Sequence, residues 1–351
     1  MGVKATNKKA EYDPARDIPR LDGKVVIITG GYSGIGLEAC RQLLMHGATV
    51  YMLIRTPARA ESVIKQLETD IPEITGKKRV HYIQVDFSNM SEVRKAGEEF
   101  MKREQRLDVL VHNAGRMVDK NMPYTLTDEG VEIQYAINHL AVAVLTRTLA
   151  PVLKATPGDV RVVVTSSSAH QFSPSSPDFS SIAGWNATRG NSLNKKSQRY
   201  AITKCMNILW TAHQQLCFSK TPGLESIMVL AVHPGWVLTD GMINGAQAWL
   251  AWLTRAFAMT PEQGAYTTLF AATAPEVREE REKYGGKYLV PFGKVQRPKK
   301  GARGEKKARI LWEATEKIMD DLLGKGGEPE VVAEQKEQNA MADVERRDSE
   351  A

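Results

Sequence analysis

The stretch from residue 25 to residue 36 reads Val-Val-Ile-Ile-Thr-Gly-Gly-Tyr-Ser-Gly-Ile-Gly. Five consecutive β-branched residues predict a strand that is buried on both faces, and an apolar-periodic helix follows the glycines directly. Glycines at such a turn let the backbone approach a pyrophosphate, and the N–H groups at the start of the helix favour its negative charge. In this position the pattern indicates a dinucleotide-binding loop, whereas glycines alone would also fit a structural turn.

Short apolar runs alternate with helical patterns along the rest of the chain. After residues 25–29 we expect strands at 49–54, 81–85, 109–112, 160–165 and 227–232, with a seventh at 287–290. The helical patterns cover 34–46, 57–69, 90–106, 128–154 and 197–219, and a last amphipathic helix precedes the C-terminal tail. This alternation predicts an α/β fold, a Rossmann-type doubly wound parallel sheet of about seven strands with helices on both faces and ligands at the carboxyl ends of the strands.

The length of 351 residues is consistent with one such domain and two polar ends. Residues 1–20 lack apolar periodicity and predict a flexible arm. Residues 325–351 are rich in Glu, Lys, Asp and Gly and predict a disordered charged tail. We therefore expect a single cofactor-binding domain over residues 21–324.

Composition and charge argue against several classes of protein. Lys and Arg exceed Asp and Glu by 47 to 41, but the excess lies mainly in the N-terminal arm and at 297–309, without the interleaved aromatic residues of a nucleic-acid partner. Three scattered cysteines do not form a disulfide framework, and seven histidines show no metal-ligand spacing. The chain carries no secretory signal pattern and no apolar run of about 18 residues, so we expect a cytoplasmic protein without a metal.

The residue at the end of the second strand discriminates between the two nicotinamide cofactors. An enzyme that selects NAD usually carries Asp or Glu there to bind the ribose 2′-hydroxyl. This chain has Arg55 instead, and a guanidinium suits the 2′-phosphate of NADP. We expect NADP (NADPH), with a solvated arginine and NAD as the alternative.

Further motifs follow in chain order. They are Asp86 after the third strand, Asn113-Ala114-Gly115 after the fourth, Asn138 in the long helix, a serine after the fifth strand, Tyr200 and Lys204 in YxxxK spacing, and Pro234-Gly235 after the sixth strand. Together with the glycine loop, this series resembles the short-chain dehydrogenase/reductase family. The segments 128–140 and 165–170 resemble its retinol dehydrogenase/WW-domain oxidoreductase branch, and the resemblance covers roughly residues 22–323.

The resemblance implies a catalytic set of four residues. A free tyrosine has a pKa near 10, but Lys204 lies one helical turn after Tyr200, and its ammonium would favour the phenolate of a general acid/base. By resemblance, Lys204 also bonds the nicotinamide ribose and Asn138 holds a water that relays protons. A serine binds the substrate oxygen, and alignment with the branch gives this role to Ser167, with Ser166 as the alternative.

The resemblance also implies the cofactor contacts. The loop around Ile35 meets the pyrophosphate, Asp86 the adenine and Asn113 the adenosine ribose, while Val237 and Thr239 meet the nicotinamide amide and phosphate. The full expected set is Gly30, Ser33, Gly34, Ile35, Gly36, Arg55, Asp86, Asn113, Ala114, Gly115, Tyr200, Lys204, Pro234, Gly235, Val237 and Thr239.

Two segments would shape the substrate side. Residues 171–198 are loop-like and fit either a surface insertion or a wall of the substrate entrance. A lid at about 240–260 carries two tryptophans and a phenylalanine, which suits a lipophilic carbonyl or alcohol substrate, a peripheral contact with a membrane or lipid surface, or ordinary core packing. Residues 1–6 match the myristoylation pattern, which would support the membrane alternative.

These observations predict an NADP(H)-dependent oxidoreductase that interconverts a carbonyl and an alcohol. The rival hypothesis is a cofactor-binding regulatory or membrane-associated adaptor with incidental activity. Because an adaptor has no need of the Asn138, Ser167, Tyr200 and Lys204 set, the sequence favours the enzyme.

Overall fold

The computed structural model describes residues 12–119, 121–236 and 259–324. Its centre is an eight-stranded sheet of order β3-β2-β1-β4-β5-β6-β7-β8, in which the first seven strands pair in parallel. The strands are β1 (Val25–Thr29), β2 (Thr49–Ile54), β3 (Val80–Gln84), β4 (Val109–His112), β5 (Arg161–Thr165), β6 (Met228–Val232), β7 (Tyr288–Val290) and β8 (Lys294–Val295). The predicted Rossmann-type sheet is thereby confirmed.

The sheet has one strand more than expected. β8 contains two residues and pairs antiparallel with β7, so that Leu289 faces Val295. A strand of this length carries no periodicity, and both its residues are exposed. It therefore lacks the apolar signal by which the other seven strands are predicted.

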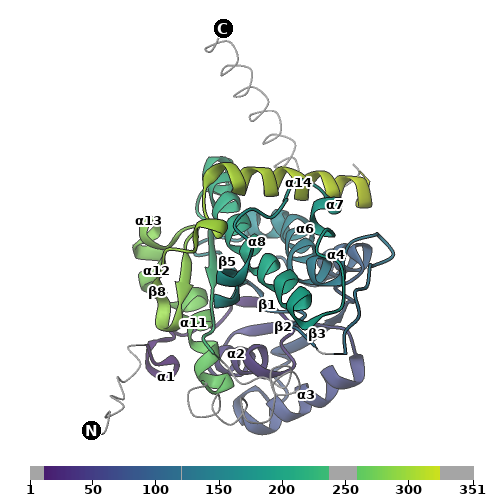
Figure 1. The fold of residues 1–351 in the computed structure, drawn as a ribbon. Coiled ribbons are helices and arrows are strands. Elements are labelled where there is room, and N and C mark those ends of the chain that lie inside the picture. The colour runs from purple at the N-terminus through teal and green to yellow at the C-terminus, as the bar shows by residue number, and fades with distance from the viewer. Residues whose placement is uncertain (1–11, 120, 237–258, 325–351) are drawn as a thin grey trace, which may run out of the picture.

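Helices cover both faces of the sheet (Figure 1). On one face lie α2 (Gly34–Met45), α3 (Pro57–Asp70) and α11 (Pro261–Thr273), and on the other lie α4 (Met90–Arg103), α6 (Ala141–Ala155) and α8 (Leu193–Lys220). Successive residues of β1 alternate between the two cores: Ile27 packs in one and Ile28 in the other, and neither is exposed. This explains why the strands are apolar on every residue rather than on every second one.

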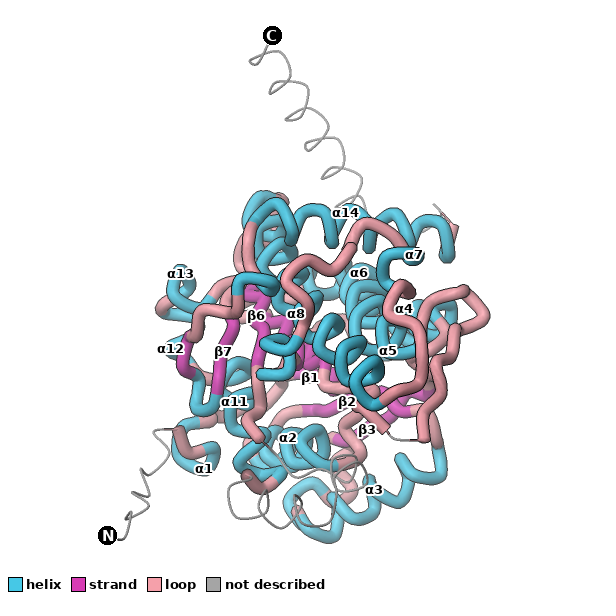
Figure 2. Tube along the Cα trace, in the orientation of Figure 1, coloured by secondary structure: helices cyan, strands magenta, loops and turns pink. Residues whose placement is uncertain are grey.

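The remaining elements are short, apart from one C-terminal helix. They are α1 (Pro14–Asp17), η1 (Pro72–Ile74), α5 (Ile133–Tyr135), η2 (Ala136–Leu140), η3 (Ser168–Phe172), α7 (Ile182–Trp185), α12 (Pro275–Glu279), α13 (Arg281–Tyr284), η4 (Pro291–Gly293), η5 (Lys300–Ala302) and α14 (Glu305–Leu323). Figure 2 shows these helices and the connecting loops around the strands.

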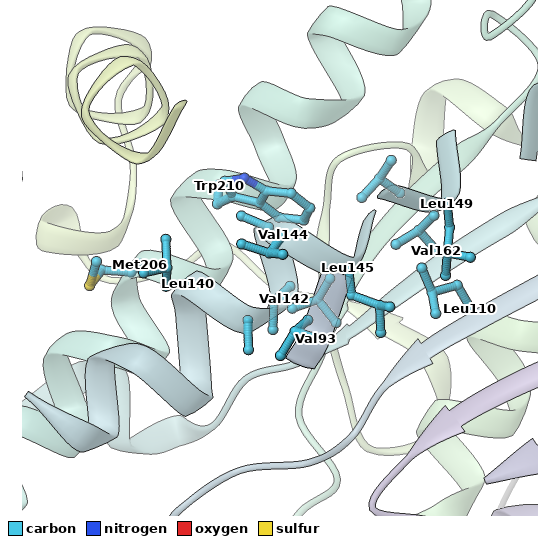
Figure 3. Close-up of a cluster of buried hydrophobic side chains, with 14 of the residues drawn as sticks. Val93, Leu110, Leu140, Val142, Val144, Leu145, Leu149, Val162, Met206 and Trp210 are labelled. Carbon is cyan, nitrogen blue, oxygen red and sulfur yellow. The ribbon is translucent and has the colours of Figure 1, made fainter. Parts of the chain in front are cut away.

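α14 packs across α8 on the face that also holds α6 (Figure 1). Trp312 donates its indole N–H to Gln214 of α8 at 3.2 Å, and Arg147 of α6 pairs with Asp320 at 2.7 Å. Figure 3 shows part of the core beneath, where Val93, Leu145 and Trp210 come from three different helices. The ion pairs of Arg147 with Glu316 and Asp320 give it a structural role in joining α6 to α14.

Residues 12–20, which the sequence assigns to a flexible arm, pack on α11 instead. Tyr12 is buried, its hydroxyl lies 3.2 Å from Thr273 Oγ1, and its ring meets Phe270 edge to face. Ile18 is buried as well. Two isolated apolar side chains give no periodicity, so only the structure shows the contact. Residues 1–11 and the predicted tail lie outside the described residues.

The long helix predicted over 128–154 begins later and is not uniformly α-helical. Ile133–Tyr135 is α-helical, Ala136–Leu140 is a π-helical turn, and α6 continues from Ala141. The stretch Ile133–Ala155 is apolar and long enough to cross a membrane, but 78% of its most apolar 18 residues are buried inside the fold. It is thus accounted for as a core helix.

The segment 171–198 lies largely on the surface but is anchored to the fold by a few buried side chains. Trp185 of α7 is buried, and α8 begins at Leu193, earlier than expected. The Asn186 side chain accepts the Glu132 N–H at 2.9 Å and donates to the Gly130 carbonyl at 2.7 Å. These bonds tie the segment to the chain that leads into α5.

Candidate active site

The glycine loop is held in a conformation that other residues would not adopt. Gly30 has a φ of +68°, and its N–H donates to the Leu53 carbonyl of the neighbouring strand. A Cβ on Gly36 would lie 2.5 Å from Asn113 Nδ2 and closer still to the Gly30 carbonyl. The start of α2 therefore packs directly on the loop, with Ser33, Gly34 and Ile35 at the helix N-terminus, where backbone N–H groups favour a phosphate.

The chain after β4 braces this loop. Thr29 Oγ1 accepts the N–H groups of Asn113 and Ala114 at 3.0 and 2.9 Å. The Asn113 side chain donates to the Thr29 carbonyl at 3.1 Å. Asn113, predicted to bind the adenosine ribose, thus holds the glycine loop in the structure, and the ribose contact stays a prediction.

The residues predicted for the adenosine end follow β2 and β3. Arg55 directly follows β2 and is exposed. Arg59 lies over the ring of Tyr32 in the glycine loop, with its guanidinium carbon 4.8 Å from the ring centroid. Asp86 accepts both the N–H and the hydroxyl of Ser88, at 2.9 and 2.7 Å. One of its carboxylate oxygens is therefore already engaged in a turn.

The two candidate serines after β5 have different surroundings. Ser166 is buried, and its hydroxyl donates to the Lys204 carbonyl at 2.7 Å. Ser167 caps η3 by accepting the Ala169 N–H at 3.1 Å, and its hydroxyl lies close enough to that of Tyr200 to lower the pKa of the phenol. The geometry brings Ser167 rather than Ser166 to the tyrosine.

Tyr200 and Lys204 lie one turn apart on α8, as their spacing predicts. The Lys204 ammonium donates to the Thr165 carbonyl at 2.9 Å and lies 5.6 Å from the centroid of the Tyr200 ring. Burial raises the pKa of Tyr200 to about 12, and the bond to Ser167 offsets only part of that rise. Burial lowers the pKa of Lys204 to about 8.

The expected lowering of the tyrosine pKa by the ammonium is thus absent from this structure. Burial governs the pKa of Tyr200, because the ammonium faces the ring and the Thr165 carbonyl. At neutral pH Tyr200 is protonated and Lys204 is mostly charged. The pair is accordingly set to donate a proton from the phenol.

Asn138 lies in the π-helical turn and connects two parts of the site. Its side-chain oxygen accepts the Arg116 N–H at 2.6 Å, and its amide donates to Thr203 Oγ1 of α8 at 3.1 Å. A Cβ on Gly115 would lie 3.4 Å from the Asn138 oxygen and 3.5 Å from Lys204 Nζ. Asn138, Gly115 and Lys204 are therefore neighbours, while the water relay stays a prediction.

The chain after β6 completes the site as far as it is described. Pro234 is buried and Gly235 has a φ of +95°; a Cβ there would collide with Met259 Sδ. The Met259 N–H donates to the Trp236 carbonyl at 2.7 Å, so the ends of the intervening segment are joined. Val237, Thr239 and most of the predicted lid lie outside the described residues.

One buried ion pair beside the site was not predicted from the sequence. Arg199 directly precedes Tyr200, and its Nε lies 3.1 Å from Glu132 Oε1; neither side chain is exposed. No local signal in the sequence marks Arg199, because it follows the polar stretch 194–198 at the start of the catalytic helix. Among residues 12–119, 121–236 and 259–324, no group of three His, Cys, Asp or Glu side chains is placed to hold a metal.

Comparison with known proteins extends these observations. The family described as short chain dehydrogenase matches residues 24–181. A short-chain dehydrogenase/reductase of Armillaria gallica is 33% identical and aligns over 85% of this chain and 93% of its own. Human retinol dehydrogenase 11 is 32% identical and aligns over 87% of both chains.

Solved structures agree with these relatives. A Mycobacterium paratuberculosis protein of uncharacterised function superposes with a TM-score of 0.65 at 27% identity, covering 88% of this chain and 97% of its own. A short chain dehydrogenase of Burkholderia cenocepacia in complex with NADP superposes with a TM-score of 0.56 at 27% identity, covering 78% and 98%. The fold of this chain and its sequence relatives therefore both point to the short chain dehydrogenases.

Proposed function

Because this chain belongs to the short-chain dehydrogenase/reductase family of oxidoreductases, we propose that it uses NADP(H) to interconvert a carbonyl and an alcohol on a lipophilic small molecule. The observation that carries the proposal is the contact between the Ser167 and Tyr200 hydroxyls beside the Lys204 ammonium. Asn138 and Gly115 border the same ammonium. Such a cluster supplies a proton donor, a second hydroxyl for the substrate oxygen and a fixed positive charge.

The cradle for a dinucleotide fits the residues present. A side chain on Gly36 would fill the space between Gly30 and Asn113, and the start of α2 lies beside it. When bound, the nicotinamide supplies the hydride for reduction or accepts it in oxidation. Arg55 would face the 2′-phosphate, and the NADP complex of the Burkholderia cenocepacia relative supports that preference.

In the reducing direction, the substrate carbonyl would accept hydrogen bonds from Ser167 and Tyr200. As the carbonyl carbon gains hydride, its oxygen gains negative charge, and Tyr200 transfers its phenolic proton to that oxygen. The Lys204 ammonium faces the Tyr200 ring in this structure, and it would stabilise the phenolate that remains once it moves towards the phenol oxygen. In the oxidising direction the same phenolate takes the alcohol proton, so Tyr200 serves as general acid and base in turn.

Two observations favour a lipophilic substrate. The relative from Homo sapiens is named a retinol dehydrogenase. In this chain, Trp236 follows Gly235 and is 58% exposed, and Phe172 at the end of η3 is 76% exposed. Exposed aromatic side chains next to the strand ends that carry the site suit an apolar substrate.

The test is NADPH oxidation by the purified protein over ketones and aldehydes that include retinal, steroids and polyketide-like carbonyls. We expect turnover with at least one apolar carbonyl, and its loss in Tyr200→Phe, which keeps the ring but removes the proton donor. Arg55→Asp should weaken NADPH binding while sparing NADH. Silence of the wild type across the panel would refute the proposed activity and favour the adaptor.

We also propose a cytoplasmic location with a peripheral membrane or lipid-surface contact. Residues 1–6 and the apolar segment after Thr239 motivate it, and both lie outside the described residues. Co-sedimentation of the full chain with anionic phosphatidylserine vesicles tests the contact. Binding should be lost when Trp249 and Trp252 are replaced by Ser; a full chain that stays in the supernatant would contradict it.

A further inference from the structure

His170 lies three residues after the candidate catalytic serine and is buried. Its Nδ1 is 2.7 Å from the Ser167 carbonyl oxygen, and its Nε2 is 3.3 Å from the backbone nitrogen of Lys299. The ring packs edge to face on Tyr288 of β7 at a centroid distance of 5.1 Å. The imidazole thus bridges two chain segments that are 129 residues apart.

The two partners fix the protonation state of the ring. A carbonyl oxygen only accepts hydrogen bonds, so Nδ1 must carry the proton. A backbone N–H only donates, so Nε2 must present its lone pair. Both contacts exist together only in the neutral Nδ1–H tautomer. Protonation would place a second donor, Nε2–H, opposite the Lys299 N–H, and the hydrogen bond between them would be lost.

The bridge acts on the geometry of Ser167. The Ser167 hydroxyl meets Tyr200, and the orientation of that hydroxyl depends on the peptide that follows it. His170 holds this peptide through its carbonyl, while the same hydroxyl accepts the Ala169 N–H. A rotated peptide would withdraw the serine from the tyrosine.

The other side of the bridge is the basic segment 297–309, which leads into α14 and includes its first residues. Besides its backbone contact with His170, Lys299 donates from Nζ to the Gln171 carbonyl, and Lys307 donates to the Ser175 carbonyl at 3.2 Å. Two lysines and one imidazole therefore fasten this segment to the loop that follows Ser167. Part of the positive charge at 297–309 therefore lies against the loop that follows Ser167.

The surrounding charges favour the neutral ring. Burial lowers the pKa of His170, the Ser167 carbonyl opposes this, and the Lys299 charge adds to the lowering. His233, after β6, is a second histidine whose charge would act on the ring, and Tyr288 contacts the ring from β7. The helix α8 packs on η3, and its titratable residues on this part of the helix are Tyr200, Lys204 and Cys205.

We propose that His170 is a positioning residue: in its neutral Nδ1–H form it orients Ser167 and couples the catalytic loop to the basic segment 297–309. This inference rests on the proposed function for its kinetic test only. The tautomer itself is a property of the wild-type protein and can be measured without turnover.

Two replacements separate the two hydrogen bonds. His170→Asn keeps a donor near the Nδ1 position and loses the Nε2 acceptor, whereas His170→Gln keeps an acceptor near Nε2 and loses the donor to Ser167. We expect His170→Gln to lower kcat about tenfold or more, with NADPH affinity unchanged, and His170→Asn to stay within about threefold of wild type. Equal kcat losses in both variants, or none in either, would overturn the proposal.

The pH profile gives a second readout, taken where circular dichroism shows folded protein. Wild-type kcat should fall as pH drops below the ordinary histidine pKa, and His170→Asn should lack this limb. Lys299→Pro removes the N–H facing Nε2 at a residue whose φ is −57°, which proline can adopt. It should shrink the limb that Lys299→Ala retains, because Lys299→Ala loses the same charge but keeps the N–H that the charged ring opposes; equal limbs in both variants would contradict the bridge.

Nitrogen-15 NMR of the wild type distinguishes this proposal from the proposed function. At about pH 7 the His170 ring should show the neutral Nδ1–H pattern. An Nε2–H tautomer or a charged ring would overturn the proposal even in an active enzyme. An inactive enzyme with the Nδ1–H tautomer would refute the proposed activity and leave the bridge intact.

Discussion

Replacing Glu132 by Gln should destabilise the protein more than any surface change of similar size. Glu132 and Arg199 are both fully buried, with Oε1 and Nε 3.1 Å apart. The Arg199 guanidinium also donates to the Thr188 and Gly190 carbonyls at 3.0 and 2.8 Å and lies 5.2 Å from the centroid of the Tyr124 ring. Without the carboxylate, these neutral partners must hold a buried positive charge.

The expected magnitude follows from this burial. Removing one partner of a fully buried ion pair costs about 3–5 kcal/mol, because the remaining charge is left without compensation. Burial raises the pKa of Glu132 despite the opposing charge of Arg199, so the desolvation penalty on the carboxylate is itself large. At roughly 2 °C per kcal/mol in a domain of this size, Tm should fall by about 6–10 °C.

A double-mutant cycle provides the assay. Urea unfolding followed by tryptophan fluorescence gives the free energy of unfolding for Glu132→Gln, Arg199→Met and the double variant. We expect the double variant to lose less unfolding free energy than the two single variants lose together, by about 2 kcal/mol or more, because it leaves no buried charge. Additivity of the single losses within about 0.5 kcal/mol would refute the reasoning.

Three further predictions follow from the site and the core. Ser167→Ala should lower kcat by about 100-fold or more with little change in stability. Ser166→Ala should lose about 1–3 kcal/mol of unfolding free energy while keeping more activity than Ser167→Ala. A larger loss of kcat in Ser166→Ala than in Ser167→Ala would assign the catalytic role to Ser166. Gly36→Ala should weaken NADPH binding at least about tenfold in a fluorescence titration, and unchanged affinity would contradict the packing of α2 on the loop. Burial lowers the pKa values of His112, His139, His213 and His233 to about 3 or 4, so these histidines are neutral in the folded protein at pH values where the unfolded chain binds protons, below the ordinary pKa of about 6.5. The free energy of unfolding should therefore fall as pH drops from about 6.5 towards 4, by up to about 1.4 kcal/mol per pH unit for each histidine. Urea unfolding at about pH 7 and 5.5 checks this, and equal stabilities at the two pH values would contradict it.

The strands could be predicted because parallel strands between two helical layers are apolar on both faces. The predicted bounds of β1, β2 and β4 agree with the structure, and those of β3, β5, β6 and β7 differ by one residue at their ends. The motif residues after these strands lie beside one another because the carboxyl ends of parallel strands share one edge of the sheet. Ser167 follows β5, whereas Tyr200 and Lys204 lie on α8, so it was the resemblance to the family that proposed the three as one cluster.

Features that depend on single long-range contacts could not be predicted. The π-helical turn at Ala136–Leu140 carries Asn138, but its sequence is as apolar and regular as the helix that continues it. The contact of Tyr12 with α11 and the bonds of Asn186 also join segments far apart in the chain. Local patterns report periodicity and turn chemistry, and neither reports which distant partner a polar group will find.

The helix that carries the catalytic pair is also a central element of the core. α8 runs from Leu193 to Lys220, Tyr200 and Lys204 lie in its first half, and Met206 and Trp210 continue it beneath α14 (Figure 3). Amide hydrogens near Lys204 should therefore exchange with solvent only when the whole domain opens. On heating, activity and native structure should be lost in one cooperative event, without an earlier phase in which this helix frays and the rest of the fold survives.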